Sequence, residues 1–587
     1  MDQKPNSGTG SNGVWPANRS DPVSPPRVRV PGMSKREIFD VCVIGTGAGG
    51  GVMLQELCAA GLEVVALERG PKLDASHFVS DDELSIVVRD ELFSPEQVET
   101  WRPDENTPTE TGRFNMFAHC VGGTMTHWAA WSWRFLPDDF EVLSKEGPVA
   151  GASLADWPIR YEELEPFYER AESDFGVSGD AKSNAFAPKP KRAYPNPPHP
   201  LRRGSEIFSA AAKKIGKTPF PVPMAINSRA YAGRPQCVYG GACQQYGCPI
   251  HAKATTLSVC IPKALATGKL DLRTRARALA IETEKDGSAR SVRYLDAEGN
   301  EQEVFARQFV VSCNTVGTPH LLHMSNSGRF PDGLANASGQ MGRNLTYHVG
   351  DLVNFLVDEP TRSFTGLETH LAIDDWHASD PKRGFIRGGV VADMNMQTKQ
   401  PITYALASAA GHPKAGRGWG ADFKDFLRDA PRTVGLVAIL EDLPMESNTV
   451  DLDPDVKDVH GLPAPRLTHR NHPNDLAMVR WYRQRMLELA DAAGAKTAWP
   501  LVSPLSLVDE TSALKGSGHF HGTCRMGDDP QRSVVDRWCR AHDVPNLWVV
   551  DSSVLPTSAG YNPTLTIVAN AYRVADHFVR EAKRGSL

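Results

Sequence analysis

The chain has 587 residues, of which 41% are hydrophobic and 23% are charged, and its formal net charge is -6 at pH 7. A chain of this length is too long for one simple core, so two large domains are expected. The net negative charge gives no basic surface, which argues against a nucleic-acid partner. No uninterrupted apolar run approaches the ~18–20 residues that a bilayer-spanning helix needs, so no transmembrane segment is expected.

Residues 1–35 are rich in Pro, Gly, Ser and Asn and contain no apolar segment. This composition predicts a disordered tail and neither a secretory signal nor a membrane anchor. Arg27 and Arg29 are separated by Val28, so the tail has no twin-arginine pair. Two locations stay open: the cytoplasm, or the periplasm if an exported partner subunit carries the chain.

Residues 39–70 predict a strand, a glycine turn, a helix and a second strand. The turn has the spacing G-x-G-x-x-G, and an acid ends the second strand 23 residues after the first glycine. This arrangement is typical of a dinucleotide site, in which the turn and the helix N-terminus hold a pyrophosphate and the acid binds the ribose hydroxyls. The residues are Gly45, Gly47, Gly50 and Glu68.

Further along the chain, Tyr161–Phe175 has the apolar spacing of an amphipathic helix. Short strands follow over 269–309, with a turn at Asp286–Gly287. Apolar runs at Leu352–Val357 and Val434–Leu440 predict antiparallel strands. Residues 547–551 predict a buried strand that ends in an acid, and 566–580 predict a helix.

The α/β signals therefore lie near the N-terminus, in the middle and near the C-terminus, with antiparallel material between them. We expect an α/β protein, α+β overall, in which a Rossmann-like nucleotide-binding domain receives an inserted substrate domain built on an antiparallel sheet. The predicted nucleotide-binding domain comprises 36–155, 235–348 and 515–587. The predicted substrate domain comprises 156–234 and 349–514.

Four separated segments together resemble the glucose–methanol–choline (GMC) family of flavin oxidoreductases. The first is the glycine fingerprint. The second is Gly122-Gly123 followed by Thr126-His127-Trp128, and the third is Asn314–Leu322. The fourth runs from His519 to Ala575. The likeness extends in order along nearly the whole chain and is weakest across 70–110, 180–230 and 349–514.

The resemblance implies FAD as the cofactor. Gly45, Gly47, Gly50 and Glu68 match its adenosine and pyrophosphate contacts, and Gly122 and Gly123 match the loop beside the flavin. Asp551 and the backbone around Pro563–Thr564 match the ribityl and isoalloxazine contacts, and a backbone contact to adenine is expected near Arg275–Ala278. His127 resembles the residue through which pyranose oxidases attach FAD covalently; the alternative is that His127 only packs beside the flavin.

Oxidising an alcohol requires a neutral base for the hydroxyl proton, and imidazole suits this role near pH 7. The resemblance places the catalytic histidine at His519 and its partner at Asn562, with hydride transfer to flavin N5. His521 is the rival base, although its spacing to Gly522-Thr523 does not fit the family.

Cys237, Cys243 and Cys248 are separated by five and then four residues in a glycine-containing loop. Sugar dehydrogenases that resemble this chain have a comparable loop, and some hold a 3Fe–4S cluster there. Three ordinary thiols or a zinc site are the alternatives.

The expected function is an FAD-dependent dehydrogenase of sugars, glycosides or polyols. Relatives with such loops usually work with a small companion subunit and a cytochrome c acceptor. An oxygen-using oxidase of the pyranose-oxidase type is the alternative. A third interpretation, a flavin-binding electron-transfer chain without its own substrate, does not account for His519 and Asn562.

Overall fold

The computed structural model describes residues 38–78, 97–241, 243, 246–394, 405–406, 408–409, 411–501 and 518–587. The predicted disordered tail, residues 1–35, lies outside these residues. Residues from Ile38 to Leu587 form one compact unit.

The first sheet has seven strands in the order β6-β2-β1-β9-β8-β7, and β19 also pairs with β9. β6, β2, β1, β9 and β19 run parallel, while β8 and β7 are antiparallel additions. The strands are β1 (Ile38–Ile44), β2 (Val64–Glu68), β6 (Leu270–Thr274), β7 (Arg277–Thr283), β8 (Ala289–Leu295), β9 (Glu301–Val311) and β19 (Leu547–Val549). The predicted strands around the glycine turn and over 269–309 are confirmed.

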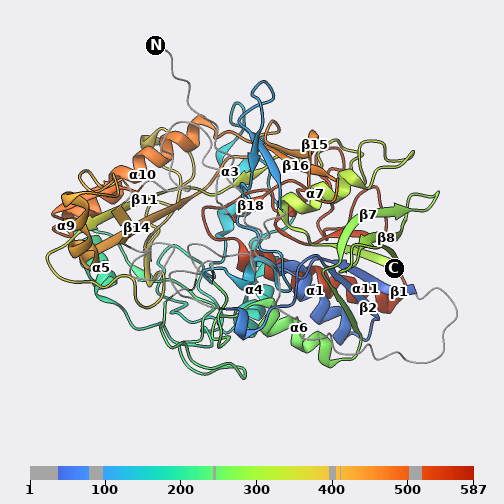
Figure 1. The fold of residues 1–587 in the computed structure, drawn as a ribbon, viewed down its shortest axis with the longest axis horizontal. Helices are drawn as coiled ribbons and strands as arrows, with labels where there is room; N and C mark the ends of the chain where they lie inside the picture. The colour runs from blue at the N-terminus through green and yellow to red at the C-terminus, as the bar shows by residue number, and fades with distance from the viewer. Residues whose placement is uncertain are drawn as a thin grey trace, which may run out of the picture. The chain divides into compact units, whose positions relative to one another are not determined.

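A layer of helices covers the first sheet. α1 (Ala48–Ala59) contacts α6 (Thr256–Ala266) and α11 (Thr564–Arg584), and α11 contacts α4 (Tyr161–Phe175). Figure 1 shows α1, α6 and α11 in the same part of the molecule as β1 and β2. β2 is buried along its whole length, as expected for a parallel strand covered on both faces. The predicted helix Tyr161–Phe175 is confirmed at both ends.

The second sheet has six strands in the order β17-β11-β14-β13-β12-β5, all paired antiparallel. α10 (Pro473–Ala492) packs on β11 and β14, and α5 (Arg203–Lys214) packs against α10. The pairing of β11 with β14 confirms the antiparallel strands predicted from the two apolar runs. The strands are β5 (Phe220–Pro221), β11 (Val349–Leu356), β12 (Leu371–Ile373), β13 (Gly389–Asp393), β14 (Thr433–Leu440) and β17 (Thr497–Pro500).

A smaller sheet joins β3 (Glu99–Arg102), β4 (Glu110–Gly112), β15 (Thr449–Lys457) and β16 (Pro463–Thr468). β3 and β4 belong to the predicted nucleotide-binding domain, whereas β15 and β16 belong to the predicted substrate domain, so this sheet joins both. The predicted domain boundaries stay a prediction. β10 (Thr346–Tyr347) pairs with β18 (Phe520–His521), and the short helices α3 (Val142–Glu146), α7 (Asn314–Met324) and α9 (Ala421–Asp429) complete the fold.

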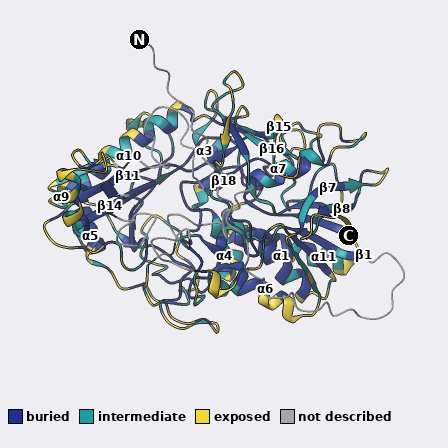
Figure 2. Ribbon diagram, in the orientation of Figure 1, coloured by how far each residue is buried: buried dark blue, intermediate teal, exposed yellow. Residues whose placement is uncertain are grey.

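Figure 2 shows the buried residues concentrated along the two large sheets and on the helix faces that cover them. The fully buried side chains include Trp548 on β19 and Tyr572 on α11, so the C-terminal segment belongs to the core of the first sheet. Among the described helices, none combines the length and apolar character needed to cross a bilayer.

Candidate active site

The glycine turn after β1 is as tight as the sequence predicts. Gly45 has φ +92°, and a Cβ there would lie 2.2 Å from the carbonyl oxygen of Ser312. A Cβ on Gly50 would lie 2.0 Å from the carbonyl oxygen of Gly45, so Gly50 lets α1 approach the strand. Gly47 differs, because a Cβ there would meet nothing nearer than Gly123 at 3.9 Å. Gly47 therefore borders open space, where a bound group can approach the backbone.

That space is one cavity along the carboxyl ends of the parallel strands, with an empty volume of about 1300 Å³ including its mouth. β1 contributes the glycine turn, β2 contributes Glu68, β9 leads into Asn314, and β19 leads into Asp551. Ligands of open α/β folds bind at this edge of the sheet. The predicted residues that line the cavity are Gly45, Gly47, Glu68, Gly123, Asp551, Pro563 and Thr564, together with Ala276, Arg277 and Ala278.

Glu68 is held in place by its own chain. One carboxylate oxygen accepts hydrogen bonds from the Thr46 amide at 3.1 Å and the Thr46 hydroxyl at 2.8 Å. The other oxygen accepts from the Gly70 amide at 3.1 Å. Burial raises the pKa of this carboxyl group, and the hydrogen bonds act in the opposite direction. Glu68 is thus fixed at the cavity wall, where its remaining acceptor sites can meet ribose hydroxyls.

Asp551 links two strand ends. It accepts hydrogen bonds from the Ser553 amide at 2.8 Å, the Asn314 amide at 3.0 Å and the Thr318 hydroxyl at 2.6 Å. Asn314 has φ +70°, a conformation that asparagine tolerates better than most residues. The position predicted for a ribityl contact therefore also fastens the first turn of α7 to the end of β19.

Gly122 and His127, also predicted at the cofactor, lie outside the set of described residues that line the cavity, as does Gly50. The Gly122 amide donates to the Thr46 hydroxyl at 3.0 Å, and its φ of +96° starts the turn that brings Gly123 to Gly47. His127 is buried, and its Nε2 lies 2.9 Å from the carbonyl oxygen of Met116. A flavin bond at Nε2 would require this contact to break.

His519 and Asn562 are not among the described residues that line the cavity, but their chain neighbours Gly518, Phe520 and Pro563 do line it. The part of the cavity wall formed by these neighbours is called the catalytic end below, and the part formed by the glycine turn is called the nucleotide end. Asn562 Nδ2 lies 3.3 Å from His519 Nε2, so the pair predicted from residues 43 positions apart meets in the structure. Burial lowers the pKa of His519 to about 4, which keeps the imidazole neutral near pH 7.

His521, the rival base, is fully buried, and burial lowers its pKa to about 3. Neither ring nitrogen has a hydrogen-bond partner among the described residues. Its ring lies 5.2 Å from that of His348, and no described bond joins it to Asn562.

Sequence reasoning missed two residues beside this pair. His348 Nδ1 lies 3.1 Å from His519 Nδ1, and Trp133 Nε1 donates to Asn562 Oδ1 at 3.0 Å. Trp133 follows the Gly122–Trp128 segment by five residues, and nothing in residue type separates His348 from the other histidines. The position of His348 beside His519 follows from the pairing of Tyr347 with Phe520, which arises only when β10 and β18 pair in the folded chain.

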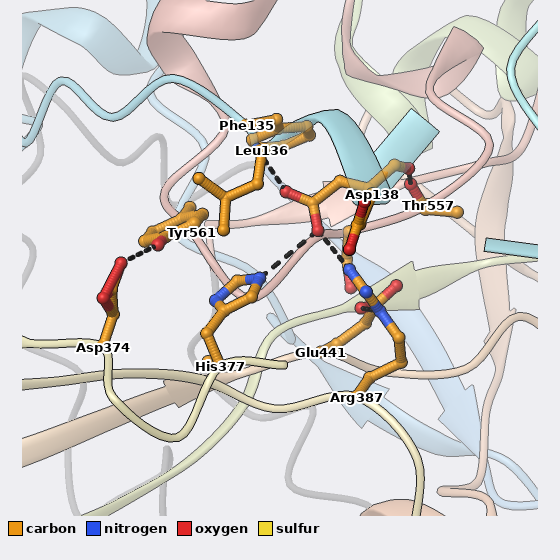
Figure 3. A network of polar contacts seen from close by, with 12 residues as sticks. Phe135, Leu136, Asp138, Asp374, His377, Arg387, Glu441, Thr557 and Tyr561 are labelled. Atoms are coloured by element: carbon orange, nitrogen blue, oxygen red, sulfur yellow. Dashed lines mark hydrogen bonds and ion pairs between the residues drawn. The ribbon is translucent and has the colours of Figure 1, made fainter. Parts of the chain in front are cut away.

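A buried ionic network supports the loop that carries Asn562. Arg387 pairs with Asp139 and, at 2.7 Å, with Glu441, and His377 Nε2 lies 3.3 Å from Asp139. His377 stacks on Tyr561 at 4.6 Å, and the Tyr561 hydroxyl donates to Asp374 (Figure 3). Because Tyr561 precedes Asn562 in the chain, these contacts fix the backbone at the catalytic end of the cavity.

Cys237, Cys243 and Cys248 are half-buried thiols. The pKa of Cys237 rises to about 12, chiefly because it is buried and also because the other two thiols lie nearby. Among the described residues, no group of three His, Cys, Asp or Glu side chains is arranged to hold a metal ion. Lys253, buried beside this loop, donates to the carbonyl oxygens of Trp128, Cys243 and Tyr246.

A glycine cradle at parallel strand ends, with a neutral imidazole and an amide next to residues of the cavity wall, is typical of a dinucleotide-binding oxidoreductase. Models of the GMC oxidoreductase family match residues 157–350 and 444–571. The 2-methyl-1,2-propanediol dehydrogenase of Mycolicibacterium austroafricanum is 33% identical, over 92% of this chain and 95% of that protein. The fructose dehydrogenase large subunit of Gluconobacter japonicus is 29% identical, over 93% of this chain and 98% of the relative.

Among solved structures, pyridoxine 4-oxidase from Mesorbium loti superimposes with a TM-score of 0.62 at 18% identity. The match spans 92% of this chain and 99% of that one, which establishes the shared fold. The chain belongs to the GMC oxidoreductase family. The family and the glycine turn that lines the cavity support FAD as the cofactor, and the predicted α/β fold class is confirmed.

Proposed function

We propose that this chain oxidises a hydroxyl group of a sugar, glycoside or polyol to a carbonyl and passes the electrons to an acceptor other than oxygen, such as a cytochrome. Relatives named as dehydrogenases of a diol and of fructose support this substrate class. Bound FAD would supply the hydride acceptor, its N5 atom.

The contact of 3.3 Å between His519 and Asn562 carries the proposal. His519 Nε2 accepts the hydroxyl proton, and the Asn562 amide donates a hydrogen bond to the same substrate oxygen. Because burial keeps His519 neutral near pH 7, one of its ring nitrogens is unprotonated before substrate binds. The glycine cradle and Glu68 would hold the adenosine diphosphate part of the cofactor at the other end of the cavity.

The test is to mix the holoenzyme anaerobically with each member of a panel of sugars and polyols and to monitor reduction of the flavin by its absorbance. The wild-type chain should bleach with at least one of them. His519→Ala should keep its flavin and bleach at least ~100-fold more slowly, the loss expected when a general base is removed. Equal bleaching by His519→Ala would contradict the role of this residue as the base.

The electron acceptor is a separate question. We propose that the loop with Cys237, Cys243 and Cys248 holds a 3Fe–4S cluster. Only the spacing of the three cysteines supports this proposal. The described thiols are not arranged to hold a metal ion, so the loop would have to rearrange around the cluster. Iron and acid-labile sulfide in the purified protein would support the cluster. Absence of iron together with rapid oxygen consumption on an electrode would favour the oxidase of pyranose-oxidase type.

Two further proposals concern the cofactor link and the partners. Covalent attachment of FAD through His127 would leave flavin absorbance with the protein after acid precipitation, and release of all flavin would exclude it. A small companion subunit and a cytochrome c acceptor are proposed because one relative is named as a large subunit. Co-export with such a subunit would place the chain in the periplasm, and fractionation of cells with and without the partner would test this.

A further inference from the structure

We propose that Trp133 and His348 are positioning residues that fix which ring nitrogen of His519 carries the proton. The inference rests on the proposed role of His519. Four hydrogen bonds form one chain of contacts through the catalytic end. Trp133 Nε1 lies 3.0 Å from Asn562 Oδ1, Asn562 Nδ2 lies 3.3 Å from His519 Nε2, His519 Nδ1 lies 3.1 Å from His348 Nδ1, and His348 Nε2 lies 2.8 Å from the carbonyl oxygen of Ser558.

Both ends of this chain have a fixed polarity. An indole N–H can only donate a hydrogen bond, and a peptide carbonyl oxygen can only accept one. Trp133 therefore holds the oxygen of the Asn562 amide, which turns the amide nitrogen toward His519. At the other end, the carbonyl oxygen of Ser558 requires a proton on His348 Nε2.

The protons between the two ends follow from these constraints. Burial lowers the pKa of His348 well below its usual range, so the ring is neutral near pH 7. With its proton on Nε2, its Nδ1 can only accept, and His519 Nδ1 must donate to it. His519 Nε2 must then accept from Asn562. One proton arrangement satisfies all four bonds, and it leaves the lone pair of His519 on Nε2. The opposite tautomer would place two N–H groups against each other at Asn562.

This arrangement suits the proposed chemistry. The base atom faces the amide that would share the substrate oxygen, so a hydroxyl bound there meets a lone pair and not a proton. Once Nε2 takes the proton, Nδ1–H still donates to His348, so the imidazolium keeps its support. Trp133, His348 and Asn562 are all buried, which protects the bonds from exchange with bulk water.

The fold explains why His348 faces His519. β10 and β18 pair antiparallel with Tyr347 opposite Phe520, so the residues that follow and precede them, His348 and His519, also lie opposite each other. Trp133 is held by aromatic neighbours, with its ring 5.3 Å from Tyr561 and 5.9 Å from Phe220.

The first experiment measures the tautomers directly and needs no substrate. Holoenzyme with ¹⁵N-labelled histidine is studied by NMR, and the signals are assigned with His519→Gln and His348→Gln. His519 should be protonated on Nδ1 and His348 on Nε2. A proton on Nε2 of His519 would overturn the proposal.

The second experiment measures flavin reduction by the best substrate of the panel. Trp133→Phe keeps an aromatic ring but removes the donor, and should slow reduction by about 10- to 100-fold with KM changed by less than about threefold. Trp131→Phe is the matched control, because Trp131 is equally buried and its N–H has no partner among the described residues. It should stay within about twofold of wild type. Equal effects of the two substitutions would contradict a positioning role for Trp133.

The third experiment separates the acceptor at residue 348 from simple packing. His348→Leu lacks the acceptor and should slow flavin reduction by about 100-fold relative to the wild type. His348→Gln can accept a hydrogen bond from His519 and donate one to Ser558, so its flavin should be reduced at least about tenfold faster than that of His348→Leu. No recovery, or no loss in His348→Leu, would overturn the inference. If His519→Ala instead reduces its flavin normally, the proposed function itself fails, and the NMR result still decides the proton arrangement.

Discussion

The two ends of the cavity are built in different ways. The nucleotide end is made of backbone: a glycine turn, helix α1 and the ends of parallel strands, with Glu68 and Asp551 fastened by bonds to their own chain. The catalytic end is made of side chains from segments far apart in sequence. The first end depends on the space that glycines leave, and the second depends on hydrogen bonds and buried charges, so substitutions should damage them in different ways.

The largest effect is expected at the catalytic end. Arg387→Leu leaves the buried carboxylates Asp139 and Glu441 without their cation and should cost about 3–5 kcal/mol of unfolding free energy. Urea denaturation of the holoenzyme measures this loss. Arg428→Leu is the control, because its partner Asp425 and Arg428 itself are exposed, and it should change stability by less than about 1 kcal/mol. Similar losses in both variants would show that burial of the network is unimportant.

At the nucleotide end, Gly45→Ala should cost about 3 kcal/mol or more and abolish flavin retention, because the new Cβ meets the Ser312 carbonyl oxygen in a left-handed conformation. Gly61→Ala separates the two causes. Gly61 has nearly the same φ, +91°, with nothing within 4 Å of the added atom, so it should lose only about 1 kcal/mol. Thermal unfolding and bound-flavin absorbance measure both. Equal losses would mean that the contact with Ser312 contributes nothing.

A smaller and more selective effect is expected for Gly47→Ala. The added methyl group enters the cavity beside Gly123 without a clash, so the flavin-free protein should unfold as the wild type does. FAD should bind about tenfold or more weakly, since the pyrophosphate loses its approach to the backbone. Flavin titration of the flavin-free protein gives the affinity. Unchanged binding would place the pyrophosphate elsewhere.

A further effect concerns acid sensitivity and appears only when the pH is lowered. His521 is buried with a pKa of about 3, below its unfolded value of ~6.5. The unfolded chain therefore binds a proton that the folded chain does not, and stability falls as pH drops below about 6.5. The unfolding free energy of the wild type should fall between pH 7 and pH 5, and in His521→Phe this fall should be about 2 kcal/mol smaller. Urea denaturation at both pH values measures the difference. An unchanged pH dependence would show that His521 takes up a proton in the folded protein.

The same contrast explains what the sequence could predict. The glycine spacing, the acid on β2 and the helix Tyr161–Phe175 are local patterns, and each formed where it was expected. Asn562 and His519 were placed by family resemblance, and the structure brings them together, although their roles stay predictions. Trp133 and His348 could not be found, because their contacts depend on strand pairing and loop packing between segments that no local pattern links.

One edge of β9 pairs with β1, and the opposite edge is shared between β8 and β19. The first half of β9 pairs with β8, and its last residues, Phe309–Val311, pair with β19. The short strand β19 therefore completes the sheet edge from which Asp551 reaches the cavity, and α11 closes the helix layer beside it. A variant truncated before Leu547 would leave this part of the β9 edge unpaired and lose Asp551 together with α11, so it should fail to retain the coenzyme.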